Sequence, residues 1–195
     1  MLQNYNRYKV LKVFLDNPLE NFGLREISRI VNLAPVSVLN YLAEFEKEGV
    51  IIKSIKKGNP IYFSNRDSEK FRLYQKISIF YELNNSGLVD YLWDKLSPET
   101  LILYGSYSRG EAVNESDIDI FVIGKEKRVD LGKFEKEFQK RINVLFESRI
   151  DNVSNELKNN LVNGIILKGY LYVLDENKNN KRQGKGKVDI KDGKR

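Results

Sequence analysis

The amino-acid sequence predicts an α+β protein with two folded parts, the second of which is an α/β unit with a short mixed sheet. Three observations support this class. The first 65 residues show helical apolar spacing and then two strand-like runs around a basic turn. From Thr100 onward, short apolar strands alternate with helical segments, as in small α/β units. Residues 176–195 are rich in Lys, Gly and Asn and lack aromatic residues, which predicts a basic, disordered tail.

Composition narrows the chemistry available to the protein. The 195 residues are 41% hydrophobic, enough for a core in each part, and include neither Cys nor His. Disulfides, thiolate chemistry, imidazole bases and the usual zinc sites are therefore excluded. Any catalysis must use carboxylates, hydroxyls, basic side chains or a bound metal. Because no run of about 18 apolar residues occurs and residues 1–8 are polar, we expect a cytoplasmic protein without a membrane partner.

Charge is unevenly distributed along the chain. The formal net charge is +6, and most of it lies in residues 176–195. Such a tail would either contact nucleic acid as an electrostatic arm or remain a solvated end, and the composition favours the solvated end.

The first 65 residues read as three helices followed by a hairpin. Asn17-Pro18 ends the first helix, Pro35 suits the first turn of the third, and Gly49 ends the third. The apolar positions expected to face the core of these helices are Val10, Leu11, Phe14 and Leu15, then Leu24, Ile27, Ile30 and Val31, then Val38, Leu42 and Phe45. The expected strands are Val50–Ile55 and Ile61–Phe63, on either side of the basic turn Lys56–Pro60.

Two helices joined by a tight turn and followed by a basic hairpin resemble the winged helix-turn-helix regulators of archaea and bacteria. The resemblance implies that residues 1–65 bind double-stranded DNA, with the third helix in the major groove. The residues expected to contact bases or phosphates from that helix are Ser37, Asn40 and Tyr41. The residues expected to meet phosphates from the hairpin are Lys53, Lys56 and Lys57. A domain used for dimerisation or protein contacts remains the alternative.

Residues 66–97 are expected to form a helical connector. Its apolar positions are Phe71, Leu73, Ile77, Phe80, Tyr81 and Leu83. We interpret them as core or as the interface of a homodimer, in preference to a cofactor site.

The strongest chemical signal lies in residues 98–175. A strand ends at Gly105-Ser106, and a later strand opens with Asp117-Ile118-Asp119. Because alternate residues of a strand share a face, Asp117 and Asp119 are expected to project together and to attract a hard cation such as Mg²⁺. A glycine before a helix permits close backbone approach to phosphate. Together these features indicate metal-assisted phosphoryl or nucleotidyl transfer.

These residues strongly resemble the minimal, antitoxin-like members of the DNA polymerase β nucleotidyltransferase superfamily. The family pattern, Gly-Ser followed by ten residues and Asp-x-Asp, is unbroken from Gly105 to Asp119, and the resemblance covers about residues 86–174. It implies that Gly105 and Ser106 hold the triphosphate of ATP or another nucleoside triphosphate, and that Asp117 and Asp119 bind two Mg²⁺ ions. Arg109 would either neutralise phosphate or form a salt bridge with Glu111 or Asp119. Ser116 would position the loop.

One position departs from the family pattern. The expected strand Ile142–Glu147 has Asn143 where the family has a third carboxylate. Asparagine is a weak metal ligand through its carbonyl and accepts no proton, while Glu147 lies roughly 13 Å farther along the strand. The departure affects turnover more than nucleotide binding.

The resemblance implies transfer of a nucleoside monophosphate, AMP from ATP, to a hydroxyl of a protein acceptor. Minimal nucleotidyltransferase antitoxins of this kind modify a HEPN-type toxin, which makes such a toxin the expected partner and autoregulation an expected role. The alternative is a transcriptional regulator whose nucleotide-binding domain has weak or no catalysis.

Overall fold

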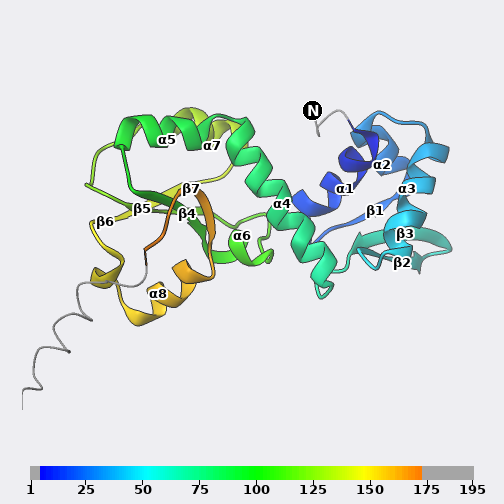
Figure 1. Ribbon diagram of the computed structural model, residues 1–195. Helices are drawn as coiled ribbons and strands as arrows, with labels where there is room; N and C mark the ends of the chain where they lie inside the picture. Colours follow the sequence, from blue (N-terminus) through cyan, green and yellow to red (C-terminus); the bar gives the residue numbers. More distant parts are fainter. Residues whose placement is uncertain (1–4, 173–195) are drawn as a thin grey trace, which may run out of the picture.

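Helix α4, Glu69–Asn85, runs between the two folded parts of the computed structural model, which describes residues 5–172 (Figure 1). The predicted tail, residues 176–195, lies outside the described residues. Among the described residues, no helix is both long and apolar enough to cross a membrane.

The N-terminal part consists of three helices packed on a three-stranded antiparallel sheet. The helices are α1 (Asn6–Asp16), α2 (Leu24–Val31) and α3 (Pro35–Lys47). The strands follow the order β1-β3-β2, with bounds Asn21–Gly23, Ile51–Lys56 and Asn59–Ser64 for β1, β2 and β3. The hairpin was predicted, but β1 was not. Its three residues are too few to show an alternating pattern, and Phe22 is buried because pairing with β3 places it opposite Tyr62.

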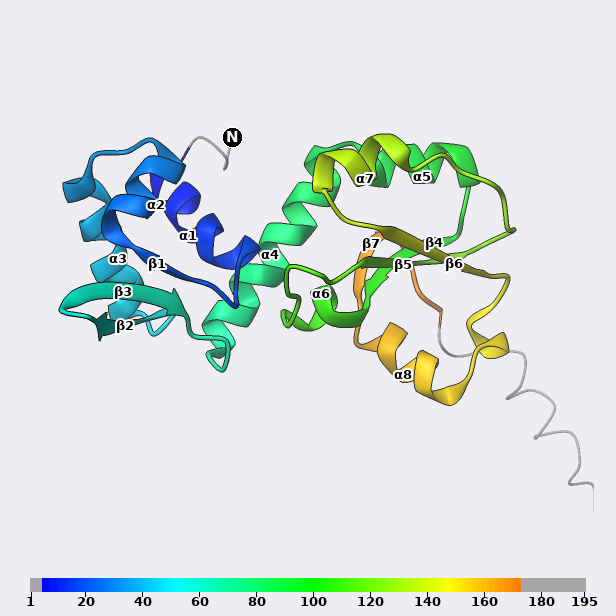
Figure 2. The same ribbon diagram turned by 180° about the vertical axis from the view of Figure 1, so that it is seen from behind.

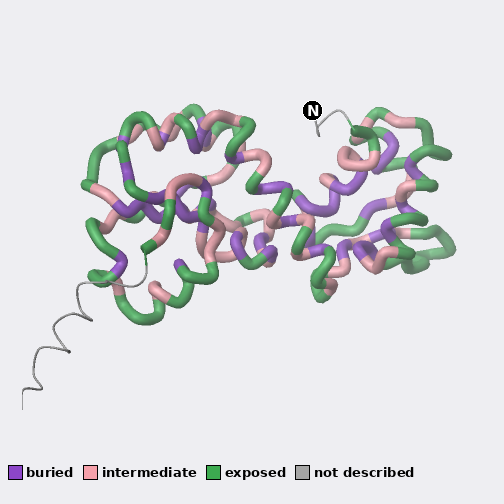
Figure 3. Tube along the Cα trace, viewed as in Figure 1, coloured by how far each residue is buried: buried purple, intermediate pink, exposed green. Residues whose placement is uncertain are grey.

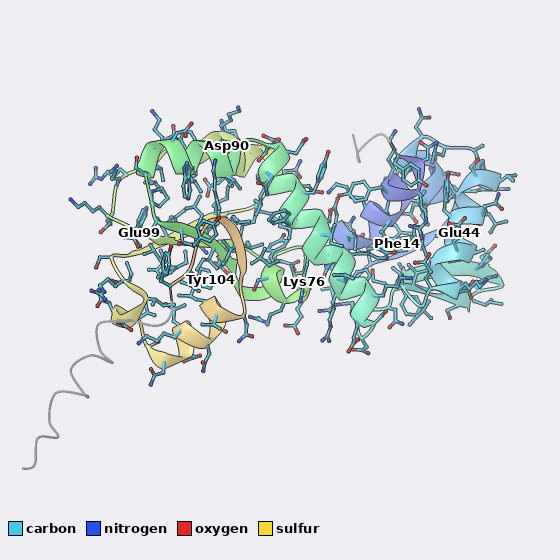
Figure 4. The ribbon with its side chains drawn as sticks, in the orientation of Figure 1. Phe14, Glu44, Lys76, Asp90, Glu99 and Tyr104 are labelled. Carbon is cyan, nitrogen blue, oxygen red and sulfur yellow. The ribbon has the colours of Figure 1, made fainter. Side chains whose placement is uncertain are left out.

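The core of this part follows the predicted helical spacing with one exception. Val38, Leu42 and Phe45 of α3 are all fully buried, and Pro35 occupies the start of that helix. Phe14 packs edge-on against Phe22 in the same core (Figure 4). Ile30 was expected on the inner face of α2, but its side chain is 56% exposed. Helix α2 has only eight residues and buries only Ile27 and Ser28, so its inner face is narrower than the sequence pattern indicates.

The second part is a four-stranded mixed sheet in the order β6-β5-β4-β7. Strands β5 and β6 are parallel, and the other pairs are antiparallel. The strands are β4 (Thr100–Tyr104), β5 (Ile118–Ile123), β6 (Ile142–Glu147) and β7 (Ile165–Gly169). The short mixed sheet expected from the sequence is therefore present.

Helices cover both faces of this sheet. Helices α5 (Leu88–Leu96) and α7 (Gly132–Phe138) cover one face, and α8 (Asn155–Val162) covers the other (Figure 2). The short helix α6 (Gly105–Arg109) connects β4 to the loop before β5, and the single turn η2 (Ile150–Asn152) precedes α8. The middle of β4 and β5 is buried on both sides (Figure 3). The strand ends, where the aspartates lie, are the accessible region.

Helix α4 buries only part of the apolar stripe that the sequence shows. Phe71 and Leu83 are buried as expected, but three other apolar side chains of the predicted stripe are largely exposed. These are Leu73, Ile77 and Phe80. The buried face includes Gln75 and Ser78, because α4 contacts both folded parts and its polar side chains hydrogen-bond with groups of those parts.

The loop after α6 contacts α4, which also hydrogen-bonds to α1. The amide of Gln75 donates to the carbonyl oxygens of Leu15 in α1, at 3.3 Å, and Ala112 in the loop, at 3.1 Å. Gly110 has φ +70° and lies against the backbone of Arg72, where a Cβ atom would clash. The loop that leads to Asp117 is therefore held by α1 and α4 together.

Candidate nucleotide and metal site

Strand pairing places three polar side chains side by side at one end of the sheet. Asp119 is opposite Tyr104 in the β4–β5 pair and opposite Asn143 in the β5–β6 pair. Because paired residues of neighbouring strands share a face, all three lie on the side of the sheet covered by α8. Asp117 immediately precedes β5 and, two residues before Asp119, has the same direction.

The two carboxylates converge on one amide. The Nδ2 atom of Asn143 donates to Oδ1 of Asp119 at 3.0 Å and lies 3.4 Å from Oδ2 of Asp117. The structure therefore brings together the three residues that the sequence singled out as metal ligands. Among the described residues, no group of three or more acidic, His or Cys side chains is arranged to hold a metal ion.

This donor set fits one hard cation better than two. Two carboxylates that point at a common position supply the oxygen ligands that Mg²⁺ prefers. Asn143 currently presents its N–H group, which cannot ligate a metal, so its carbonyl would have to turn toward the ion. Within residues 5–172, no third carboxylate joins the two aspartates in a metal-binding group.

Gly105 is required by its position beside Asp119. Its φ is +73°, and a Cβ atom there would stand 2.5 Å from Oδ2 of Asp119. Only glycine meets both conditions without strain. The Oγ atom of Ser108 donates to the carbonyl of Gly105 at 2.9 Å and stabilises the turn. Ser106, the other predicted phosphate contact, follows directly and is half-buried.

Two further predicted residues organise the loop between Ser106 and Asp117. Arg109 forms a salt bridge with Glu111 at 2.8 Å, one of the two interpretations left open by the sequence. The hydrogen bond from Arg109 holds the pKa of Glu111 below its ordinary value. The Oγ atom of Ser116 accepts from the backbone N–H of Val113 at 2.9 Å, so Ser116 shapes the turn that delivers Asp117.

Tyr104 belongs to the site but was not singled out from the sequence. Burial, together with the charge of Asp119, raises the pKa of its hydroxyl. Its ring packs edge-on against Phe121 at the end of β4 (Figure 4). Tyr104 directly precedes Gly105 in the sequence, and this neighbouring position is the signal from which it could have been predicted.

The residues predicted to contact DNA lie on α3 and the β2–β3 hairpin. Ser37 and Asn40 are exposed, whereas Tyr41 is half-buried against the N-terminal core. The three lysines, Lys53, Lys56 and Lys57, are all exposed.

The acidic end of α3 is paired with basic side chains. Arg7 forms ion pairs with both Glu44, at 3.0 Å, and Glu48, and Lys70 lies 2.8 Å from Glu48. Glu44 lies on the outer side of the N-terminal part (Figure 4).

Comparisons with known proteins concern the second part of the chain. No curated protein matches the chain. A solved structure described as a crystal structure of the toxin-antitoxin with AMP-PNP is 24% identical, with a TM-score of 0.36. It covers 45% of this chain and 75% of that chain, a likeness too low to support an argument. The family model for the nucleotidyltransferase domain matches residues 86–173. Over residues 86–173, this chain is therefore similar to nucleotidyltransferase domains.

Proposed function

We propose that the protein is a DNA-binding nucleotidyltransferase that transfers AMP from ATP to a hydroxyl of a protein acceptor. The observation that supports this proposal most directly is the convergence of Asp117 and Asp119 beside Gly105, within the matched domain. The pattern from Gly105 to Asp119, and its resemblance to minimal nucleotidyltransferases, supports the nucleotide as substrate.

In this proposal Asp117 and Asp119 hold Mg²⁺, which would neutralise phosphate charge and lower the pKa of the attacking hydroxyl. Because Gly105 has no side chain, the carboxylate of Asp119 lies close to its backbone, and a cation held by Asp119 would meet the phosphate oxygens beside this turn. The N–H group of Asn143 offsets the repulsion between the two carboxylates and keeps them pointed at the same position.

Incubation with α-labelled ATP, Mg²⁺ and candidate protein acceptors tests the transfer. We expect label on the acceptor, and loss of at least 100-fold in the rate for Asp117→Asn and Asp119→Asn, in the range seen when transition-state charge stabilisation is removed. Asp94→Asn is the matched control, because Asp94 is an exposed carboxylate on α5. Equal labelling by all three variants would refute the proposal.

We further propose that the N-terminal part is a winged-helix domain that binds double-stranded DNA. The exposure of Ser37 and Asn40 supports base contacts, and the exposed lysines of the hairpin support phosphate contacts. Pairing of Glu44 and Glu48 with Arg7 reduces the negative charge that would repel DNA from α3.

A HEPN-type toxin is the proposed acceptor, and autoregulation the proposed role. A small helical protein encoded beside this gene would be the protein to test first as the acceptor. The exposed side chains Leu73, Ile77 and Phe80 on α4 are the surface proposed for a homodimer.

A second candidate function is a nucleotide-binding transcriptional regulator without turnover. It is favoured by Asn143, whose amide occupies the place of a third carboxylate and donates to both aspartates. ATP binding and DNA binding without any transfer of label would select this candidate over the enzyme.

A further inference from the structure

A cavity of about 570 Å³ lies between the two folded parts. It is bounded by the end of α1, the middle of α4, the loop after α6 and the end of α7. Its volume is within the range of small-molecule sites, which often form at domain interfaces. Asp117, Asp119 and Asn143 do not line it. The cavity is therefore lined by residues other than the three of the aspartate site, although Ile118, between the two aspartates, contributes to its wall.

The cavity combines an apolar surface with a charged one. Its apolar lining includes Leu15, Ile79, Ile118 and Phe138. Its charged lining consists of two ammonium groups and three carboxylates: Lys12, Lys140, Asp16, Glu82 and Glu137. With the ordinary charges of these groups, the lining carries an excess of one negative charge.

Lys12 forms ion pairs with two of the carboxylates. Its Nζ lies 2.8 Å from Oδ1 of Asp16 and 2.5 Å from Oε1 of Glu82. The same Oε1 atom accepts from the hydroxyl groups of Tyr8 and Ser78, both at 3.2 Å. All of these contacts use one oxygen of each carboxylate. The other oxygen of Asp16 and of Glu82 has no protein donor among the described residues.

The other two charged residues of the lining, Lys140 and Glu137, differ in their contacts. Lys140 donates to the carbonyl oxygen of Asn114 at 2.8 Å, and burial lowers its pKa, although the charges of Asp16 and Asp117 oppose this. Glu137 has no hydrogen bond or ion pair with any described residue. With Lys140 counted as a cation, the lining still carries one excess negative charge, and Glu137 is its carboxylate without a cationic partner among the described residues.

We propose that this cavity binds a small organic dication, two primary ammonium groups joined by a short apolar chain. One ammonium would be taken by the free oxygens of Asp16 and Glu82, and the other by Glu137, which is exposed at the edge of the cavity. The methylene groups would lie against Leu15, Ile79 and Phe138. Because α1 and α7 belong to different folded parts, the ligand would connect them across α4 and stabilise their relative placement.

Calorimetric titration and thermal unfolding of the full chain, with 1,4-diaminobutane as the probe, test the proposal. We expect saturable binding and a raised melting temperature. Succinate, which has the same chain length and the opposite charge, should produce neither effect. Absence of diamine binding, or an equal response to succinate, would overturn the proposal.

Variants locate the bound cation. Glu137→Gln should weaken diamine binding about tenfold, or about 1.4 kcal/mol, and Asp16→Asn should also weaken it. Glu126→Gln, an exposed carboxylate outside the cavity, is the control and should bind as the parent does. Unchanged affinity in Glu137→Gln and Asp16→Asn refutes the site.

The aspartate site is tested separately with the Asp117→Asn/Asp119→Asn double variant. It should lose ATP binding and keep diamine binding. Loss of diamine binding in this variant would place the cation at the aspartates and overturn the proposal. Failure of ATP binding in the parent protein would count against the nucleotidyltransferase and leave the result for the cavity unaffected.

Discussion

Gly105 and Asp119 lie so close together that a Cβ atom on Gly105 would stand 2.5 Å from the carboxylate of Asp119. The two residues are 14 positions apart in the sequence. Gly105 directly follows β4, Asp119 lies in β5, and the pairing of these two strands brings them together. Gly105 is therefore related to the predicted metal ligand Asp119 by contact in the structure as well as by spacing in the sequence.

Gly105→Ala should abolish detectable ATP binding. The added methyl group would displace Asp119, and the left-handed φ of +73° would cost about 1 kcal/mol in folding stability. Gly87→Ala is the matched control, because Gly87 has φ +80° and open space around it. Both variants should lose similar stability in denaturant titrations, and only Gly105→Ala should lose ATP binding. Equal ATP affinity in the two would contradict the assigned role of the close approach.

Asn143→Asp should make the protein more dependent on Mg²⁺. Without metal, a third carboxylate replaces the N–H donor to Asp119 and repels both aspartates, so the melting temperature should fall. With Mg²⁺ the melting temperature should rise more than in the parent, and any transferase rate should increase. Asn160→Asp adds the same charge on the exposed surface of α8 and is the control. A Mg²⁺ response no larger than that of the control would exclude a metal site at Asn143.

Gln75→Leu should destabilise the protein by about 2 kcal/mol. The substitution leaves the buried carbonyls of Leu15 and Ala112 without their shared donor, and unsatisfied buried groups cost about 1–3 kcal/mol each. Leu73→Gln, on the exposed face of the same helix, should change stability by less than about 0.5 kcal/mol. Urea titrations of both variants measure the difference. Similar stabilities would mean that Gln75 does not join the two parts.

Glu48 should contribute stability that is lost in acid. The hydrogen bond from Lys70, with further support from Tyr74 and the charge of Arg7, lowers the pKa of Glu48 from 4.5. Because the folded pKa is below the unfolded one, the contribution is complete above the unfolded pKa and disappears as pH falls through the folded value. Glu48→Gln should therefore be less stable than the parent at neutral pH, with the difference shrinking at lower pH. A difference that stays constant across this acid range would count against the ion pairs.

Lys56→Ala and Lys57→Ala should weaken DNA binding without changing sequence preference. Each lost phosphate contact should reduce the slope of log K against log salt by roughly 0.9. Lys95→Ala, an exposed lysine on α5, is the control for net charge. Asn40→Ala should instead relax sequence preference and leave the slope unchanged. Binding measured at several salt concentrations separates these outcomes, and identical slopes for all lysine variants would contradict the hairpin contact.

Local sequence patterns were sufficient to predict features that depend on a single helix or strand. Pro35 and the spacing of Val38, Leu42 and Phe45 predicted helix α3 and its buried face, because a helix brings residues three and four apart onto one side. The alternation in β5 likewise predicted that Asp117 and Asp119 point the same way.

Local sequence patterns did not predict features that depend on contact with a second segment of the chain. Strand β1 exists because Phe22 pairs opposite Tyr62, 40 residues away. On α4, Leu73, Ile77 and Phe80 of the predicted apolar stripe are exposed and do not join the core, because the buried face of that helix is set by the two parts on which it packs. The sequence pattern did not separate core positions from those of a homodimer interface.

By itself, the sequence determined the order of the main helices and strands apart from β1, the glycine-serine turn and the common direction of the two aspartates, since backbone periodicity acts within a few residues. Only the tertiary structure decided that Asn143 donates to both aspartates, that Gln75 joins the two parts and that a charged cavity lies between them. These features depend on contacts between residues 24 or more positions apart, such as Asn143 and Asp119 or Gln75 and Ala112. Packing of whole elements sets such distances, and no local pattern encodes them.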